Sequence, residues 1–395
     1  MSKIPGPNKT APRDLFNAVM DGQIPVRPPV AAKIWMDLAC RLTNTPFIDA
    51  LNDPLVAMRV IVDACLETGM DAARLFTFPF RKVEMRDGVY IHVDERGRRI
   101  GTIDIAGGWA THCDNPADRD IARDDIMMSY SHFIAAEPAI NTAADLQRMA
   151  VPPAAYLEAV GFGKAVDGLL REAGNQIALV GDCGSGTLAF HVAMRGMTQA
   201  LMDFIDDPAL LEASMERGVD LCLQRARFFL NHGVRILRYN DSVANMSVIS
   251  PGHWRTFILP HLKRFCDEVH RMAANARVYC HICGNTLPIM EDLAVSGLDC
   301  IAPLDPRGGM TVAQVRERLG PTFPLMGGMD TLSFVNASPD DFMAEANRCL
   351  EAGAAGPYVL GSGCVVPRTA RVEHLRAMRP IAEMWATRHR RPGPT

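Results

Sequence analysis

From residue 176 onward, short apolar runs alternate with longer segments of helical periodicity. The apolar runs, each of strand length, lie at residues 177–180, 234–239, 277–281, 300–304, 323–327 and 358–361. The segments of helical periodicity lie at residues 188–205, 208–233, 251–274, 286–297, 311–319 and 339–352. Continuous apolar strands separated by helices are typical of parallel strands that are buried on both faces. This part of the chain therefore predicts six strand–helix units of one parallel sheet.

Two more strands are predicted in the N-terminal third, one in the apolar, proline-rich stretch near Val26 and one around Leu75. Helical periodicity in this third falls at residues 14–20, 33–42 and 54–69. Eight strands in all predict an α/β chain with a (β/α)8 TIM barrel, in which the chemistry gathers at the C-terminal ends of the strands. We expect a single barrel domain at residues 26–388, after an N-terminal extension at residues 1–25 and before a basic tail at residues 389–395.

One stretch interrupts this alternation of strands and helices. At about residues 82–108 apolar and polar positions alternate, and the alternation is broken by Asp87-Gly88 and Arg96-Gly97. Such a pattern predicts an antiparallel β-hairpin or meander, which we interpret as an excursion from the barrel. Residues 114–137 are polar and weakly periodic, so we expect a loop with one helix there.

Composition narrows the class of protein. A chain of 395 residues with 48% hydrophobic and 22% charged residues is long enough for a large core. A net charge of -4 gives no reason to expect nucleic acid or an anionic membrane as a partner. Residues 1–13 lack the apolar core of a signal peptide, and no apolar run reaches the ~18 residues of a membrane span. The 11 cysteines form no regular framework, which favours a reducing, cytoplasmic setting.

The ends of two predicted strands carry the ligand types of an open zinc site. His281 and Cys283 follow the strand at 277–281, and Cys364 follows the strand at 358–361. Side chains alternate along a strand, so a His-x-Cys pair places both groups on the same side. Catalytic zinc sites use three N, S or O ligands and keep a fourth position exchangeable. Asp305, on the strand between, is a candidate fourth ligand that substrate would displace. The alternative is that these are ordinary core or loop residues.

Three further residues are candidates for the barrel mouth. Asp241 directly follows the strand at 234–239, where it would orient substrate or accept a proton. The alternative role for Asp241 is to cap the turn that follows it. His112 and His191 are weaker candidates, because a lone histidine on a helix or loop is more often structural.

The order of motifs resembles the uroporphyrinogen decarboxylase superfamily over residues 177–384. The motifs are Tyr239-Asn240-Asp241-Ser242, Ile249-Ser250-Pro251, Phe257-Ile258-Leu259-Pro260, His281-Ile282-Cys283-Gly284-Asn285, Gly297-Leu298-Asp299, Met326-Gly327-Gly328-Met329-Asp330 and Leu360-Gly361-Ser362-Gly363-Cys364. The resemblance implies a (β/α)8 barrel and a homodimer.

Within the superfamily, the chain resembles the zinc methyltransferases more than the decarboxylases. True decarboxylases carry an Arg-Gln-Ala-Gly-Arg stretch after the first strand, and residues 30–37 lack it. His281, Cys283 and Cys364 match the zinc ligands of methylcobamide:coenzyme M methyltransferases, of corrinoid-dependent O-demethylating methyltransferases and, more remotely, of cobalamin-independent methionine synthase. Asp305 stands where methionine synthase has a glutamate ligand. The chain has no Asp-x-His-x-x-Gly corrinoid motif, so a corrinoid (cobalamin) cofactor would be carried by a separate partner protein.

The resemblance implies methyl transfer between a small methylated substrate (O-, N- or S-methyl) and a corrinoid protein or thiol acceptor. Zinc serves such transfer either by holding an acceptor thiol as thiolate or as a Lewis acid on a methyl-ether oxygen. The N-terminal elaboration favours the second mode, with transfer to a corrinoid protein. Two alternatives stay open. One is a metal-free decarboxylase, for which Arg27, Arg74, Arg238 and Arg307 are candidate cationic grips. The other is a non-catalytic subunit that binds a corrinoid protein.

Overall fold

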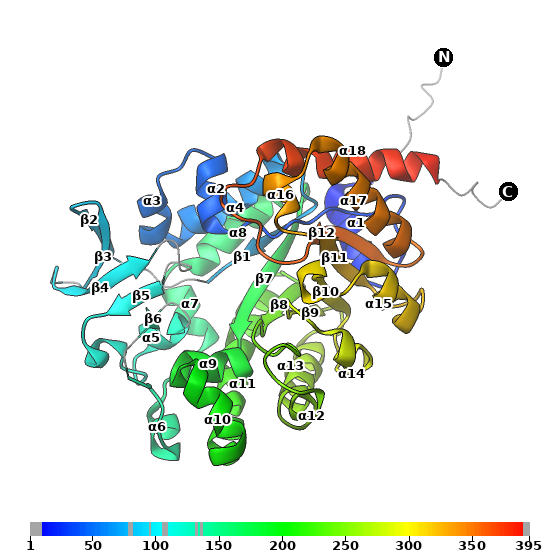
Figure 1. Cartoon of the computed structure of the whole chain (residues 1–395). Coiled ribbons are helices and arrows are strands. Elements are labelled where there is room, and N and C mark those ends of the chain that lie inside the picture. Colours follow the sequence, from blue (N-terminus) through cyan, green and yellow to red (C-terminus); the bar gives the residue numbers. More distant parts are fainter. Residues whose placement is uncertain are drawn as a thin grey trace.

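The computed structural model describes residues 10–77, 82–94, 96–104, 110–130, 133–134 and 137–389. These residues form an α/β fold with one curved parallel sheet, helices packed around it, and a separate antiparallel sheet (Figure 1). Residues 1–9 of the predicted extension, 105–108 of the predicted excursion and 390–395 of the predicted tail lie outside the described residues.

The parallel sheet has seven strands, and its order follows the chain. The strands are β1 (Ala72–Leu75), β7 (Ala178–Ser185), β8 (Ile236–Asn240), β9 (Arg277–His281), β10 (Cys300–Leu304), β11 (Leu325–Met329) and β12 (Tyr358–Ser362). Nearly every strand residue is buried, because side chains pack both against the helices outside and against one another inside the curve. The six regular strands and the strand around Leu75 are confirmed.

The eighth predicted strand, near Val26, is wrong in position. Farther along the chain, two isolated parallel bridges form instead: Val30 pairs with Leu360 of β12, and Lys33 pairs with Val365, just after β12. Three prolines between residues 25 and 29 explain the shift, because proline has no N–H to donate to a ladder. The fold is therefore confirmed as an α/β fold with a curved seven-stranded parallel sheet, to which this segment adds two bridges.

The helices mostly follow the predicted periodicity. Before β7 they are α1 (Pro12–Met20), α2 (Met36–Leu42), α3 (Phe47–Asn52), α4 (Pro54–Glu67), α5 (Asp124–Met128), α6 (Ala143–Arg148), α7 (Ala154–Ala159) and α8 (Phe162–Ala173). After β7 they are α9 (Leu188–Arg195), α10 (Met197–Asp206), α11 (Pro208–Asn231), α12 (Pro251–His253), α13 (Leu259–Met272), α14 (Met290–Val295), α15 (Val312–Leu319), α16 (Ser333–Asn336), α17 (Pro339–Gly353) and α18 (Val372–Arg388).

Several of the predicted helices differ in the structure, among them the following three. The helix predicted at 33–42 begins only at Met36, because Lys33 lies in the bridge to Val365. The helix predicted at 188–205 is divided by Gly196, whose φ of 80° ends α9. A π-helical turn, η3 (Trp254–Ile258), separates α12 from α13. Among the described residues, no helix is long and apolar enough to cross a membrane.

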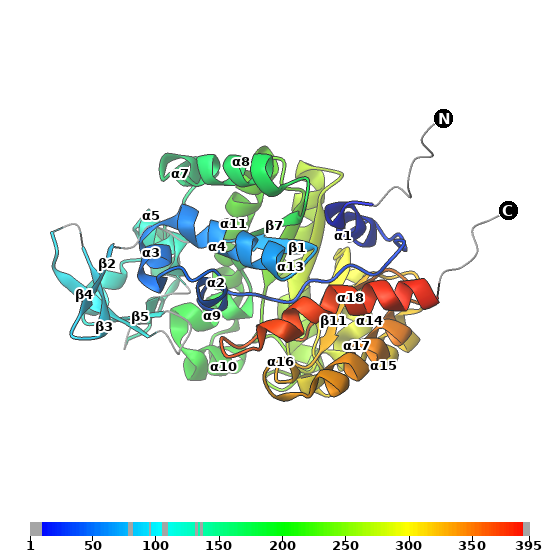
Figure 2. The ribbon, with the colours of Figure 1, turned by 90° about the horizontal axis from the view of Figure 1, so that it is seen from above.

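The second sheet lies at one side of the molecule, beside α3 and α5 and far from α18 (Figure 2). Its strands are β2 (Lys82–Arg86), β3 (Val89–Val93), β4 (Arg99–Asp104), β5 (Ala110–Cys113) and β6 (Phe133–Ile134). The first four pair antiparallel. The alternation at residues 82–108 predicted β2, β3 and β4, whereas β5 lies beyond that stretch. Asp87 and Gly88 both have positive φ values, of 51° and 77°, which suits the two-residue turn between β2 and β3.

Candidate metal centre

The turn after β9 positions His281 and Cys283. The strand pairs with β8 on one side and β10 on the other, so that His281 stands at the carboxyl edge of the sheet and is 4% exposed. Gly284 follows with a φ of 85°, a conformation that favours glycine. A Cβ at this position would lie 2.9 Å from Cγ of Asn245. The glycine therefore allows the sharp turn that directs Cys283 back toward the strand end.

The turn after β12 positions Cys364. The Ser362 hydroxyl donates to the Cys364 carbonyl at 2.6 Å and accepts from the Lys33 N–H at 2.9 Å. The Gly363 N–H donates to the carbonyl of Met329 at 2.7 Å. Two segments distant in the sequence, at Lys33 and Met329, thus hold this turn at the same edge of the sheet.

The two turns bring the three side chains together. The Nε2 atom of His281 lies 3.8 Å from Sγ of Cys364, and the ligand atoms of His281, Cys283 and Cys364 all lie within 4.8 Å of one another. Among the described residues, this is the one group of three or more His, Cys, Asp or Glu side chains with such spacing. The sequence predicted this group from strand ends that are about 80 residues apart.

Electrostatics suit two of these side chains, His281 and Cys364, to metal ligation. Burial, and then the nearby charge of Lys33, lowers the pKa of His281 well below its usual value and keeps the imidazole neutral. A hydrogen bond between the two thiols lowers the pKa of Cys364 to about 6 and raises the pKa of Cys283. A thiolate at Cys364 and a neutral imidazole are the protonation states that bind a divalent ion.

Lys33 is a site residue that the sequence reasoning missed. Its Nζ lies 3.0 Å from Nε2 of His281, and the side chain is 5% exposed. Burial lowers the pKa of this amine well below its usual value. The lone pair of Nε2 accepts either the amine or a metal ion, so Lys33 and a metal ion would compete for this atom. The only sequence signal was a lysine within an otherwise apolar stretch, residues 30–36.

A cavity beside Lys33 lies inside the curve of the sheet and has a volume of about 520 Å³. Its polar lining residues are Lys33, Arg74, Tyr279, His281 and Ser362. Apolar side chains such as Val180 and Met326 line the rest. The volume includes space that is open to solvent, and the imidazole of His281 forms part of the cavity wall.

Asp305 lies beside the group but is not part of it. One carboxylate oxygen accepts the N–H of Gly284 at 2.8 Å, and the other accepts the N–H of Arg307 at 3.0 Å. A Cβ at Gly363 would lie 3.0 Å from the Asp305 carboxylate. The side chain is therefore wedged between the two ligand-bearing turns, and its role as a fourth ligand stays a prediction.

The carboxylate of Asp241 accepts hydrogen bonds from the first residues of α9. Its buried carboxylate accepts the Thr187 hydroxyl and the N–H groups of Leu188 and Ala189, the latter at 3.0 and 2.7 Å. Burial raises its pKa to about 6, and these hydrogen bonds oppose that rise. The residue caps α9 rather than the turn that follows it, and a catalytic role stays a prediction.

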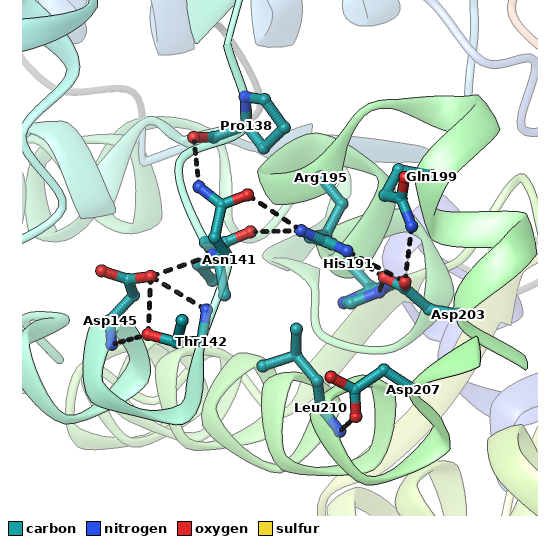
Figure 3. Close-up of polar contacts among 11 residues, drawn as sticks. Pro138, Asn141, Thr142, Asp145, His191, Arg195, Gln199, Asp203, Asp207 and Leu210 are labelled. Carbon is teal, nitrogen blue, oxygen red and sulfur yellow. Dashed lines mark hydrogen bonds and ion pairs between the residues drawn. The ribbon is translucent and has the colours of Figure 1, made fainter.

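The two other candidate histidines, His191 and His112, lie outside the group around His281. His191 is fully buried, and its Nε2 lies 2.9 Å from Asp203, which also accepts from Arg195 and Gln199 (Figure 3). This cluster joins α9 and α10 to the segment around residues 138–145 (Figure 3). His112 lies on β5, 3.9 Å from Asp104. Neither histidine belongs to the group around His281.

The four arginines proposed as carboxylate grips separate into two pairs. Arg27 forms a bidentate ion pair with Asp71 at 2.8 Å, and Arg307 is half-exposed near Asp330. Arg74 lines the cavity, and Arg238 is 2% exposed on the neighbouring part of the sheet.

Comparison with known proteins finds one matching family model and several similar proteins. The family model described as "Uroporphyrinogen decarboxylase (URO-D)" matches residues 128–385. A methylated-thiol–coenzyme M methyltransferase from Methanosarcina mazei is 25% identical over 192 residues, which cover 48% of this chain and 48% of the relative. A methylcobamide:CoM methyltransferase from Methanosarcina barkeri is 25% identical over 170 residues, which cover 43% and 47%. The chain thus spans about half the length of these methyltransferases.

Two further matches are a decarboxylase and a solved methyltransferase structure. A uroporphyrinogen decarboxylase from Nocardia farcinica is 31% identical over 224 residues, which cover 52% of this chain and 60% of the relative. A solved methyltransferase from Methanosarcina mazei superposes with a TM-score of 0.66 at 19% identity, and covers 95% of this chain and 99% of that one. The structural likeness shows the fold alone.

Proposed function

Because the chain belongs to the uroporphyrinogen decarboxylase family, we propose that it is a zinc-dependent methyltransferase of that family. Its reaction moves a methyl group between a small methylated substrate and a corrinoid protein or thiol acceptor. The observation that carries the proposal is the group of His281, Cys283 and Cys364, whose ligand atoms lie within 4.8 Å at the carboxyl edge of the sheet. The similarity to methyltransferases named for coenzyme M and methylcobamide supports it.

The donor set fits zinc. Tetrahedral zinc with its usual Zn–S and Zn–N bonds separates neighbouring ligand atoms by roughly 3.6–3.8 Å. The distance of 3.8 Å between Nε2 of His281 and Sγ of Cys364 agrees with that spacing. Two thiolates balance the charge of a dication, and the imidazole leaves one coordination position for a reactant.

The residues have separate tasks in this proposal. Bound zinc would supply Lewis-acid chemistry, either on the oxygen of a methyl ether or on an acceptor thiol. His281, Cys283 and Cys364 would hold it, and the hydrogen bonds of Asp305 and Ser362 would keep the two turns in place. The apolar wall of the cavity would exclude water from the reacting methyl group. We further propose that the methyl group moves toward a corrinoid carried by a separate protein. The protein would assemble as a homodimer. The segment bridged at Val30 would occupy the eighth strand position of the barrel.

A decarboxylase is the second candidate. The Nocardia farcinica relative and the position of Arg74 and Arg238 inside the sheet favour it. A decarboxylase without a metal gives no role to three clustered His and Cys side chains, so the zinc methyltransferase accounts for more of the site. A non-catalytic subunit that binds a corrinoid protein would keep the fold without needing turnover.

Metal analysis followed by a methyl-transfer assay tests the proposal. We expect about one zinc per chain in the purified protein. The bound zinc should fall severalfold in Cys283→Ser and Cys364→Ser. Cys266→Ala is the matched control, since Cys266 is buried on α13 away from the group. Wild-type protein with reduced cobalamin should form methylcobalamin from some member of a panel of methyl ethers, methylamines and methyl thioethers. Metal-free protein that releases CO2 from uroporphyrinogen would favour the decarboxylase instead.

A further inference from the structure

The cavity beside the candidate metal group contains a guanidinium, that of Arg74, and no carboxylate among its described lining residues. Its lining includes Lys33 and Arg74, and none of the described lining residues is an aspartate or a glutamate. The two nearby carboxylates that the sequence singled out, Asp241 and Asp305, both accept backbone N–H groups instead. A cavity with this lining favours an anionic occupant.

Arg74 is the residue that most needs a partner. It lies on β1, and its NH1 atom is shielded from solvent without a hydrogen bond. No hydrogen bond or ion pair within the described part of the chain involves its side chain. Burial lowers its pKa, although a guanidinium stays charged in proteins. An unpaired buried charge is costly, so a ligand that pairs with it gains binding free energy.

The neighbouring arginine, Arg238, already has a carboxylate partner. Arg238 is paired with Asp182, and its NH2 atom donates to Oδ1 of Asn240 at 2.5 Å. Asp182 and Arg238 are register partners on β7 and β8. Two guanidinium groups therefore face one carboxylate, and the excess positive charge resides on Arg74. The Asp182 carboxylate attracts Arg74 electrostatically, but its ion pair is with Arg238.

We propose that Arg74, with Lys33 as a second donor, binds the carboxylate or sulfonate group of the methylated substrate. This inference rests on the proposed function and names its substrate class, a small methylated anion. Arg74 lies within the curve of the sheet, whereas His281 stands at the edge of the sheet. An anion held by Arg74 therefore directs the other end of the molecule, with its methyl group, toward the metal-binding side chains.

A matched pair of probes tests this binding without turnover. Methoxyacetate carries a methyl ether and a carboxylate, and 2-methoxyethanol is its neutral counterpart of similar size. Dissociation constants for both are measured by ligand-detected NMR on the zinc-loaded protein. We expect the anion to bind about tenfold or more tightly, because a charge-assisted hydrogen bond to a buried partner has that effect. Equal affinities of wild-type protein for the two probes overturn the proposal.

Variants assign the preference to Arg74. The preference should vanish in Arg74→Gln and partly return in Arg74→Lys, which restores the charge. Arg307→Gln is the control, since Arg307 is a half-exposed arginine outside the cavity and should leave the preference unchanged. A preference that survives in folded Arg74→Gln contradicts the proposal. If Arg74→Gln does not fold, Arg74→Lys decides, because a shorter ammonium should weaken methoxyacetate severalfold and leave 2-methoxyethanol unaffected.

Zinc content of the same samples separates the two proposals. Stoichiometric zinc with no preference for the anion rejects only the anion site. A preference for the anion in protein that binds no zinc rejects the proposed methyltransferase and leaves an anion site at Arg74.

Discussion

Asp305 contacts both turns of the candidate metal centre. Its carboxylate accepts the N–H of Gly284, one residue beyond Cys283, and packs against Gly363, one residue before Cys364. With one oxygen accepting the Gly284 N–H and the other accepting the Arg307 N–H, the carboxylate is fixed in orientation. Residues that orient metal ligands in this way commonly alter affinity when they are changed.

Asp305→Asn should lower zinc affinity by about 10–100-fold without removing a ligand. The amide retains one oxygen acceptor but loses the second, so the turns of Cys283 and Cys364 loosen. Cobalt-substituted protein distinguishes the roles: the absorption bands of Co²⁺–thiolate coordination should keep their position while the dissociation constant rises. Asp330→Asn, at the end of β11, is the control. A shift of the bands to those of a different donor set would show that Asp305 is itself a ligand.

Residue types at strand ends were predictable, and their partners were not. The sequence placed His281, Cys283 and Cys364 correctly at the carboxyl edge, because parallel strands order their ends by the fold alone. Asp241 caps a helix that begins more than 50 residues earlier, and Lys33 reaches His281 from the other end of the chain. Such contacts depend on three-dimensional packing that local periodicity does not encode.

At the scale of elements, His232 joins three helices. It ends α11, and its ring nitrogens lie 2.7 Å from Asp167 on α8 and 2.6 Å from Glu158 on α7. With a carboxylate at each nitrogen, both must donate, so the charged imidazolium is the form that fits. Partial burial opposes protonation, but the two hydrogen bonds outweigh it and raise the pKa of His232.

This contact should make part of the stability pH-dependent. The folded pKa lies above the unfolded value of about 6.5, so the contribution is complete below that value and is lost as pH rises through the raised folded pKa. The difference in free energy of unfolding between wild type and His232→Gln, from urea titrations at several pH values, should be largest below about pH 6 and shrink toward pH 9. His389→Gln is the control, since Nδ1 of His389 contacts the carbonyl of Trp385. A difference that is constant with pH would contradict the assignment.

Element prediction succeeded where burial sets the pattern and failed where single residues interrupt it. The strands of the parallel sheet are apolar on both faces and are clear in the sequence. The break at Gly196 was missed, because apolar spacing continues through it from α9 into α10. A network around Asp203, with Arg195 and His191, then fixes the two helices against each other (Figure 3).

At the scale of the whole molecule, one buried carboxylate connects segments near the beginning and the end of the described chain. Asp71 precedes β1 and is 0% exposed. It accepts two hydrogen bonds from Arg27, one from the N–H of Val30 and one from Arg379 on α18. The segment bridged to β12 is thereby tied to the opposite edge of the sheet. The sequence could not predict this junction, because its members are separated by more than 300 residues.

Asp71→Asn should therefore destabilise the entire fold rather than one region. Removing the charge leaves the Arg27 guanidinium buried without its partner, which costs about 3–5 kcal/mol. Urea unfolding followed by both circular dichroism and tryptophan fluorescence should show one transition at a lower urea concentration. The free energy of unfolding should fall by that amount. Glu172→Gln, which breaks the exposed pair with Arg59, is the control and should cost less than about 1 kcal/mol. If Asp71→Asn costs no more than this control, the junction does not stabilise the sheet, and the bridges at Val30 and Lys33 must suffice to hold its two edges together.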